Sequence, residues 1–213
     1  MKLLLKNGWL SLALLLSLTT LLIYLTGHYI LTLGFYVSNG DPLSGIPGQD
    51  ERVYEMMQKW IYLSSVLYLL LKVGVISLIL HTALYLQDKD ISIHKIFKVT
   101  ILAEYIFLIP AAIKILTFHY TFPTGTLLEW HKYYIFSAIS IFNEAPVDWS
   151  YALQTLNAFE IGYWFLLAYG VSRITDLNFD RSLHIVVTSY VPALIVWIAV
   201  ITFFTLVVFP TTG

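Results

Sequence analysis

The chain of 213 residues contains no cysteine. Disulfide bonds, thiolate catalysis and cysteine-ligated metal or iron–sulfur sites are therefore excluded. Charged residues are also scarce, at 12% of the sequence, whereas an ordinary soluble domain carries about 25%. Such a low charge content, spread over a chain of this length, favours a protein whose solvent is the lipid bilayer.

An excess of positive charge is missing as well. The formal net charge is −1, and no basic patch is present that could neutralise the phosphates of a nucleic acid. The six histidines show no His-Glu-x-x-His spacing. Glycine-rich phosphate loops, serine–lysine dyads and nucleophile elbows are absent too. We therefore expect no nucleic-acid partner, no resident metal and no cofactor.

Long hydrophobic runs, in contrast, are abundant. Hydrophobic residues make up 58% of the chain, and the mean hydropathy is +0.76. Five apolar segments are long enough to cross about 30 Å of hydrocarbon as helices. They are Leu10–Tyr36, Trp60–Leu86, Val99–Phe118, Tyr151–Ile174 and Thr188–Val208. The predicted fold class is an all-α membrane protein with five transmembrane helices.

The lysines and arginines outside these segments or at their very ends predict the orientation in the membrane. One side carries seven of them and the other side three: Lys2, Lys6, Lys89, Lys95, Lys98, Arg173 and Arg181 against Arg52, Lys59 and Lys132. Because the side richer in positive charge faces the cytoplasm, we expect a cytoplasmic N-terminus and an exported C-terminus at Gly213. No small-x-small cleavage site follows the first apolar run, so we interpret that run as a retained anchor.

The segments after the first form two similar hairpins. Displacing the sequence by 88 residues aligns Gly74 with Gly162 and Asp88 with Asp176. In each copy an apolar helix is followed by a polar turn and a second apolar helix. This layout predicts parallel structural repeats, which pack about an axis along the membrane normal.

The repeat suggests a division of the chain into two parts. Residues 1–59 hold the first helix and an outer loop, and residues 60–213 form the core. Within the core we expect repeats at residues 60–118 and 150–208. The segment between them, residues 119–149, is rich in aromatic residues but too short to span, which predicts an interfacial outer loop.

One stretch carries a family resemblance. The run from Leu156 to Gly170 reads Leu-Asn-Ala-Phe-Glu-Ile-Gly-Tyr-Trp-Phe-Leu-Leu-Ala-Tyr-Gly, and residues 189–194 read Ser-Tyr-Val-Pro-Ala-Leu. With the five-helix layout, residues 60–208 resemble bacterial members of the Yip1 family of membrane proteins. The resemblance implies a protein of a bacterial inner membrane that binds or organises partners and has no catalytic residues.

Two charges of opposite sign are expected at matching depths of the repeated helices. Lys72 lies in the second apolar segment, and Glu160 lies at the equivalent position of the fourth. A lone charge at that depth costs about 2.5–3.5 kcal/mol or more. We therefore expect a mutual ion pair, which would either fix the helix register or serve a proton- or ion-coupled site. The alternative is that each charge snorkels to the membrane surface or faces its own water-filled cavity. Glu104, in the third segment, is expected to pair with Lys98 or Arg173.

Two further sets of residues are candidates for function. Glu129 and His131 lie in the outer loop. There they could serve an enzyme acting on a lipid-linked substrate or, with other outer histidines, a metal site. Ala158 and Gly162 form a small-xxx-small pattern, which lets two helices approach closely.

Three functions follow from these features. The leading hypothesis is a non-enzymatic, Yip1-like integral membrane protein that binds protein or lipid partners within the bilayer. Its partners would be membrane lipids together with another membrane protein or a second copy of the chain. The first alternative is a small transporter, or an accessory subunit of one, that uses Lys72 and Glu160. The second is a membrane enzyme acting on a lipid-linked substrate.

Overall fold

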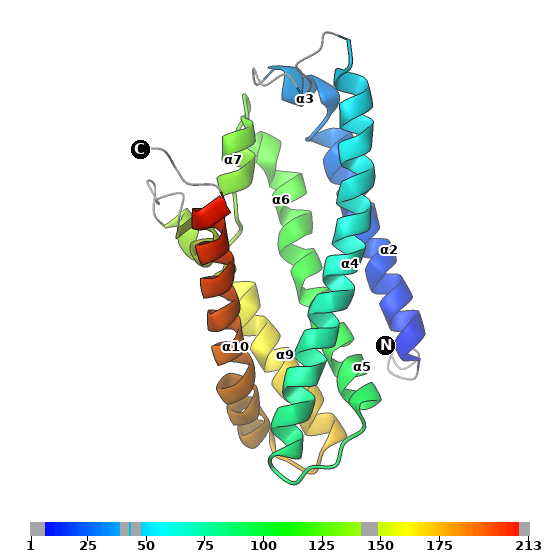
Figure 1. Cartoon of the computed structure of the whole chain (residues 1–213), viewed down its shortest axis with the longest axis vertical. Coiled ribbons are helices and arrows are strands. Elements are labelled where there is room, and N and C mark those ends of the chain that lie inside the picture. Colours follow the sequence, from blue (N-terminus) through cyan, green and yellow to red (C-terminus); the bar gives the residue numbers. More distant parts are fainter. Residues whose placement is uncertain (1–6, 39–42, 44–47, 142–148, 209–213) are drawn as a thin grey trace.

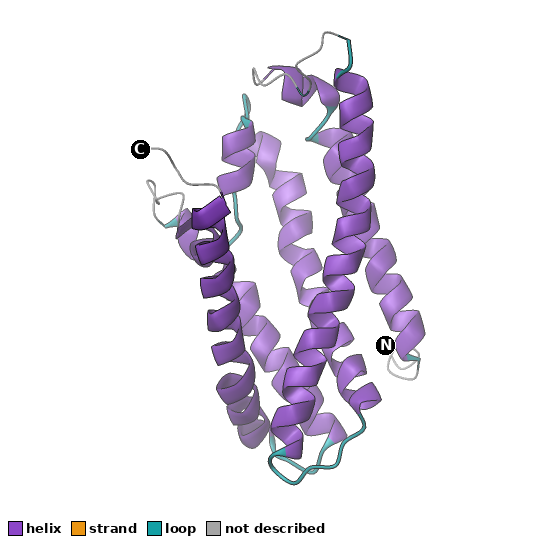
Figure 2. Ribbon diagram, viewed as in Figure 1, coloured by secondary structure: helices purple, strands orange, loops and turns teal. Residues whose placement is uncertain are grey.

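The computed structural model of the protein describes residues 7–38, 43, 48–141 and 149–208 (Figure 1). Lys2, Lys6 and Gly213, on which the expected membrane orientation partly rests, lie outside these residues. Of the described residues, 83% are helical and none belongs to a strand (Figure 2). Four helices are long and apolar enough to cross a membrane: Gly8–Tyr29, Asp50–Tyr85, Ile93–Thr121 and Phe179–Val208. The all-α class is therefore confirmed, with four helices of spanning length where the sequence predicts five.

The first expected span is divided into two helices. α2 covers Gly8–Tyr29, and the short α3 covers Leu33–Ser38. Thr32 caps α3, because its Oγ1 accepts a hydrogen bond from the backbone N–H of Phe35 at 3.2 Å. A threonine in that position favours the start of a new helix. The prediction of one continuous helix over Leu10–Tyr36 is therefore wrong at its outer end.

The second span belongs to a helix longer than expected. α4 is one helix of 36 residues, Asp50–Tyr85, so it begins ten residues before the expected span at Trp60. The helix continues through these residues because no glycine or proline lies between Asp50 and Trp60 to interrupt the backbone. At about 1.5 Å per residue α4 is roughly 54 Å long, so it is longer than the hydrocarbon core is thick.

A proline shapes the third span. It consists of α5 (Ile93–Glu104), the 3₁₀ turn η1 (Tyr105–Phe107) and α6 (Leu108–Thr121). Pro110 has no backbone N–H to donate to the carbonyl of Ile106. The helix tightens into a 3₁₀ turn just before the proline, which is a usual response to such a missing bond.

The fourth expected span, Tyr151–Ile174, is broken. α8 (Ser150–Thr155) and α9 (Ala158–Ile174) are separated at Asn157. Asn157 Oδ1 accepts a hydrogen bond from the backbone N–H of Glu160 at 2.8 Å, and such an N-cap starts a new helix. α9 has 17 residues, and it is not among the four helices of spanning length.

The segment that follows α6, described at residues 122–141, contains two short helical elements, α7 (Leu127–Lys132) and the 3₁₀ turn η2 (Ala138–Ser140). Trp130 in α7 is buried, and its ring lies 5.0 Å from that of Phe118 at the end of α6. This aromatic contact holds α7 against the outer end of the third span.

α9 supplies the centre of the main hydrophobic core. Tyr163, Leu167, Ala168 and Val171 are fully buried, and their spacing places them on one stripe of the helix. α9 packs against α5 and against α10 (Phe179–Val208), and α4 packs against the same two helices. These four helices therefore enclose a single core (Figure 1).

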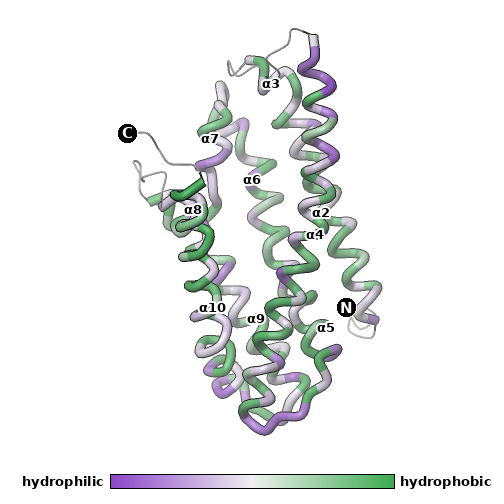
Figure 3. Tube along the Cα trace, viewed as in Figure 1, coloured by the Kyte–Doolittle hydropathy of each residue, from purple (hydrophilic) through white to green (hydrophobic). Residues whose placement is uncertain are grey.

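Hydrophobic residues occupy much of the length of the long helices (Figure 3), and many of them are exposed. Leu71 and Leu78 on α4 are exposed, as are Val200 and Phe203 on α10. Exposed leucine and phenylalanine at this density are typical of helices that face lipid, since lipid tails solvate them as well as a protein core does.

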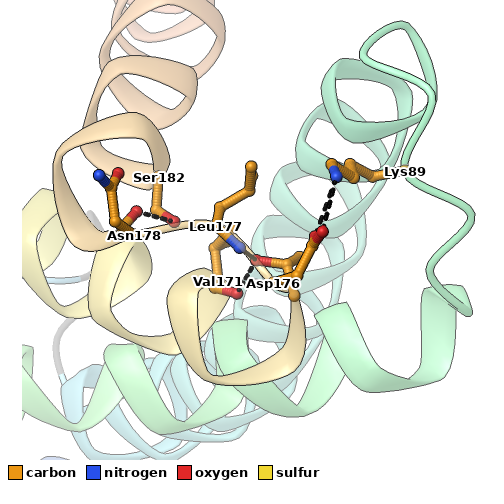
Figure 4. A network of polar contacts seen from close by, with 7 residues as sticks. Lys89, Val171, Asp176, Leu177, Asn178 and Ser182 are labelled. Atoms are coloured by element: carbon orange, nitrogen blue, oxygen red, sulfur yellow. Dashed lines mark hydrogen bonds and ion pairs between the residues drawn. The ribbon is translucent and has the colours of Figure 1, made fainter.

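The two polar turns, between α4 and α5 and between α9 and α10, lie side by side. Lys89 Nζ is 2.9 Å from Asp176 Oδ1 (Figure 4). The hydrogen bond from Lys89 lowers the pKa of Asp176 below its usual value. Because the carboxylate is well exposed, the pair contributes little to stability, but it shows that the turns of the two hairpins meet at one end of the bundle.

Two helical glycines offer a matched test of this packing. A Cβ at Gly170 in α9 would overlap the branched side chain of Val99 in α5, whereas a Cβ at Gly74 in α4 meets nothing within 4 Å. We expect Gly170→Ala to lower the free energy of unfolding by about 1–3 kcal/mol. Gly74→Ala should raise it by up to about 1 kcal/mol, because alanine favours helix. Thermal unfolding in detergent, followed by tryptophan fluorescence, measures both, and equal effects would contradict the close contact of α5 with α9.

Candidate functional site

Lys72 and Glu104 form a buried ion pair between α4 and α5. Lys72 Nζ lies 3.0 Å from Glu104 Oε2, with 21% and 3% of the two side chains exposed. The expected ion pair of Lys72 with Glu160 is therefore not formed, and the partner of Glu104 is neither Lys98 nor Arg173. The reason is that both charges can be neutralised within the first hairpin, so neither needs a partner from the second.

Aromatic rings cover the ammonium group of Lys72. Its Nζ lies 3.8 Å from the ring centroid of Phe107 and 5.2 Å from that of Tyr163. Cation–π contacts of this kind contribute about 2 kcal/mol when water is excluded. Phe107 belongs to η1, so the turn that precedes Pro110 also brings this ring over the lysine.

Two buried oxygens lie beside the ion pair, Glu104 Oε1 and the hydroxyl of Tyr163, and neither makes a hydrogen bond of ordinary geometry with a described residue. The two groups nevertheless interact with each other, electrostatically and through a weak side-chain hydrogen bond, so they lie near each other in the core. Tyr163 and Glu104 are therefore each other's polar contact in the core.

Glu160 lies in the first turn of α9, whereas the sequence predicts a position halfway along a helix. The break at Asn157 is the reason, because it starts the helix only three residues earlier. Glu160 Oε1 accepts hydrogen bonds from the Tyr190 hydroxyl at 2.7 Å and from Trp164 Nε1 at 3.1 Å. The positive end of the helix dipole also favours a carboxylate there. The second hairpin thus satisfies its own buried charge.

Tyr163 connects the two hairpins. Its ring centroid lies 5.1 Å from that of Phe107 and 5.6 Å from that of Tyr190. Since Phe107 covers Lys72 and Tyr190 binds Glu160, one tyrosine ring contacts neighbours of both charges. We call this group the central polar cluster, and it consists of Lys72, Glu104, Phe107, Glu160, Tyr163, Trp164 and Tyr190.

A cavity of about 400 Å³ lies beside the cluster, between α2, α4 and α6. Lys72 and Glu104 form one end of it, and Gln58 and Trp130 line it further toward the outer segments. Leucine and isoleucine side chains supply much of the wall: Leu15, Leu22, Ile23, Leu31, Ile61 and Ile115. The cavity is therefore largely apolar along its length and polar at the end that reaches the ion pair.

One face of α4 carries polar groups along the cavity. Gln58, Ser65, Tyr68 and Lys72 all line it, and their spacing places them near one another on the helix surface. From Gln58 to Lys72 the helix rises about 21 Å. The cavity thus extends from the outer end of α4 deep into the apolar segment.

Glu129 and His131 do not form a joint site. Glu129 belongs to a capping box at the start of α7, because its Oε2 accepts from the backbone N–H of Thr126 at 2.7 Å. Burial lowers the pKa of His131, and the nearby charge of Lys114 lowers it further. Within the part of the chain that the structure describes, no three histidine, aspartate or glutamate side chains gather as metal ligands.

The two small residues of α9 have different surroundings. A Cβ at Gly162 would come within 2.6 Å of Ile106 Cδ1, so α9 approaches the third span closely at this position. Ala158 is the first residue of α9, and its backbone N–H donates to the carbonyl of Phe136 at 3.0 Å. The glycine therefore serves helix packing, while the alanine lies at the helix start.

Sequence reasoning missed the uncharged members of the central polar cluster. Tyr163 and Trp164 lie three and four residues after Glu160, and side chains at that spacing meet on a helix. That signal was present in the sequence. Phe107 and Tyr190 come from other helices, and no local pattern links them to the charges.

Comparison of the chain with protein-family models, curated proteins and solved structures found no match. The resemblance to the Yip1 family therefore stays a prediction from the sequence. The geometry of the cluster and of the cavity is the basis for assigning a function.

Removing one member of the ion pair should be more harmful than replacing both. Lys72→Met leaves Glu104 charged and unpaired, and Glu104→Gln does the same to Lys72. We expect each to lower the free energy of unfolding by about 3–5 kcal/mol, and the double variant K72M/E104Q to stay within about 1 kcal/mol of the unaltered protein. Thermal unfolding in detergent compares the three variants. A double variant as unstable as either single one would contradict the pairing.

Proposed function

We propose that this protein is a non-enzymatic, Yip1-like integral membrane protein of a bacterial inner membrane that binds a lipid within the bilayer. The binding site is the cavity between α2, α4 and α6. The N-terminus is cytoplasmic and the C-terminus exported in this proposal, as the distribution of lysine and arginine suggests.

The observation that carries the proposal is the lining of the cavity. Its volume of about 400 Å³ lies within the range of about 300–1,000 Å³ found for small-molecule sites. Leucine and isoleucine walls from three helices suit an alkyl or isoprenoid chain, because close packing against these side chains supplies van der Waals contacts, the attraction that remains between apolar groups inside a bilayer. The ion pair at one end suits a polar headgroup. A molecule with both parts is an amphiphile.

We propose α9 as the fifth membrane crossing. It leads from α8 to the turn in which Asp176 contacts Lys89, so it connects opposite ends of the core. Its 17 residues correspond to about 25 Å of helix, which is at the short end of the range for spanning helices.

The two hairpins are structural repeats in this proposal. Lys72 and Glu160 occupy positions 88 residues apart, and each binds the second helix of its own hairpin. The packing of α4 on α5 and α10 corresponds to the packing of α9 on α10 and α5. A two-fold axis along the membrane normal would exchange these contacts.

A small transporter, or an accessory subunit of one, is the second candidate. The observation that favours it is that Glu104 and Glu160 both lie beside an interruption of a helix, at η1 and at Asn157. Buried carboxylates at discontinuous helices line ion and substrate sites in transporters. Proteoliposomes separate the two functions: transport of a solute that Glu160→Gln abolishes, without loss of folding, would favour this candidate.

Filling the cavity tests lipid binding directly. Ala111 lines the cavity on α6, while its neighbour Ala112 does not. Ala111→Phe should reduce the lipid that stays bound through purification in mild detergent by roughly tenfold, equivalent to about 1.4 kcal/mol. Ala112→Phe, the matched control, should leave it unchanged. Mass spectrometry of the extracted lipid gives its amount per chain, and equal amounts in both variants would refute the proposed site.

A further inference from the structure

We infer that the end of the cavity formed by Lys72 and Glu104 binds the headgroup of an uncharged lipid, one that accepts hydrogen bonds through a hydroxyl or carbonyl oxygen. The inference rests on the proposed lipid-binding function and names the class of lipid. Diacylglycerols and isoprenoid quinones belong to this class, whereas phospholipids and plain hydrocarbons do not.

The ion pair lies at a depth near the middle of the expected membrane span. Trp60 and Tyr85 are exposed aromatic residues on α4, and aromatic residues of this kind mark the two membrane interfaces. Lys72 lies almost midway between them in the sequence, about 18–20 Å from each along the helix. A charged headgroup is strongly disfavoured at the middle of the bilayer, so the polar part of a ligand that reaches Lys72 must be uncharged.

Charge balance leads to the same conclusion. Among the residues that line the cavity, Lys72 and Glu104 are the charged ones, and they neutralise each other at 3.0 Å. An anionic headgroup would compete with Glu104 for the ammonium and leave one excess negative charge in an apolar surrounding. A cationic headgroup would leave one excess positive charge. An uncharged group avoids both penalties.

Hydrogen-bonding capacity sets the polarity of the ligand. An ammonium group has three donors, and one of them is used by Glu104 Oε2. The lysine side chain lines the cavity and is 21% exposed, while the ring of Phe107 covers one side of its ammonium group, so we assign the remaining donors to the cavity. Glu104 Oε1 and the Tyr163 hydroxyl are fully enclosed and less able to reach a ligand. The accessible groups therefore donate, and the ligand must accept.

The apolar walls of the cavity determine where the hydrocarbon chain of the lipid lies. Beyond the ion pair the cavity is bordered by Tyr68 and Phe107 and continues past Ile61 and Ile115 toward Trp130. An oxygen-bearing headgroup next to Lys72 would place its chain along these apolar side chains. This arrangement puts the headgroup deeper in the membrane than the chain, which an uncharged headgroup tolerates when a hydrogen bond from Lys72 replaces those it made to water.

Competition for a photoactivatable probe tests the inference. The full chain is placed in phosphatidylcholine nanodiscs and labelled with an oleyl alcohol that carries a diazirine. The competitors are dioleoylglycerol, decylubiquinone, squalene and dioleoyl phosphatidylglycerol. We expect dioleoylglycerol or decylubiquinone to halve the labelling at a concentration at least about tenfold lower than the concentration of squalene or dioleoyl phosphatidylglycerol that does so. The labelled peptides should come from α2, α4 and α6.

A pair of double variants adds a matched control. K72M/E104Q removes the donors together with the carboxylate charge, and it should abolish the tenfold preference for the uncharged lipids. K89M/D176N makes the same chemical change at the exposed pair that joins the two turns, and it should keep the preference. A K72M/E104Q protein that keeps the preference would overturn the inference, and the competition series on the unaltered chain decides it even where the variant does not fold.

The outcomes separate this inference from the proposed function. If squalene competed at the same concentration as dioleoylglycerol, the cavity would bind hydrocarbon chains without recognising the headgroup. That result would overturn the inference but leave the proposed lipid binding in place. Preference for phosphatidylglycerol would overturn it in favour of an anionic headgroup. Labelling that maps outside α2, α4 and α6 would refute the proposed site itself.

Discussion

A charged side chain in the interior of a bilayer needs a partner, and this requirement organises the core of the protein. Lys72 forms an ion pair with Glu104, and Glu160 accepts hydrogen bonds from Tyr190 and Trp164. Each contact is made within one hairpin, so each fixes the register of a first helix against a second. The ring contacts of Tyr163 with Phe107 and with Tyr190 then join the hairpins. A buried polar network that is mostly satisfied specifies one arrangement of the helices.

The interruptions of the helices belong to the same scheme. Glu104 is the last residue before η1, and Glu160 follows the break at Asn157 by three residues. An interrupted helix leaves backbone groups without their usual partners, and within a membrane these groups must be satisfied by protein. Breaks and polar side chains therefore coincide in the centre of the bundle. This coincidence makes the centre the most suitable region for a binding site.

The cavity uses the ion pair as its inner end. Because the two charges neutralise each other, the site offers hydrogen-bond donors without a net charge, and the surrounding walls remain apolar. The outer pair, Glu129 and His131, adds no competing site, since Glu129 is occupied as the cap of α7.

The sequence by itself determined the all-α class and the approximate positions of the four helices long and apolar enough to cross a membrane, because a long hydrophobic run satisfies its backbone hydrogen bonds in lipid as a helix. It also identified Lys72, Glu104 and Glu160 as buried charges, since each interrupts such a run. Tertiary structure alone decided which charge meets which, because partner choice depends on the rotation of each helix about its axis. It also decided the break at Asn157, where one side-chain hydrogen bond to the Glu160 backbone outweighs an apolar pattern that continues through it. The cavity required three helices from distant parts of the chain, and no local pattern of residues could have shown it.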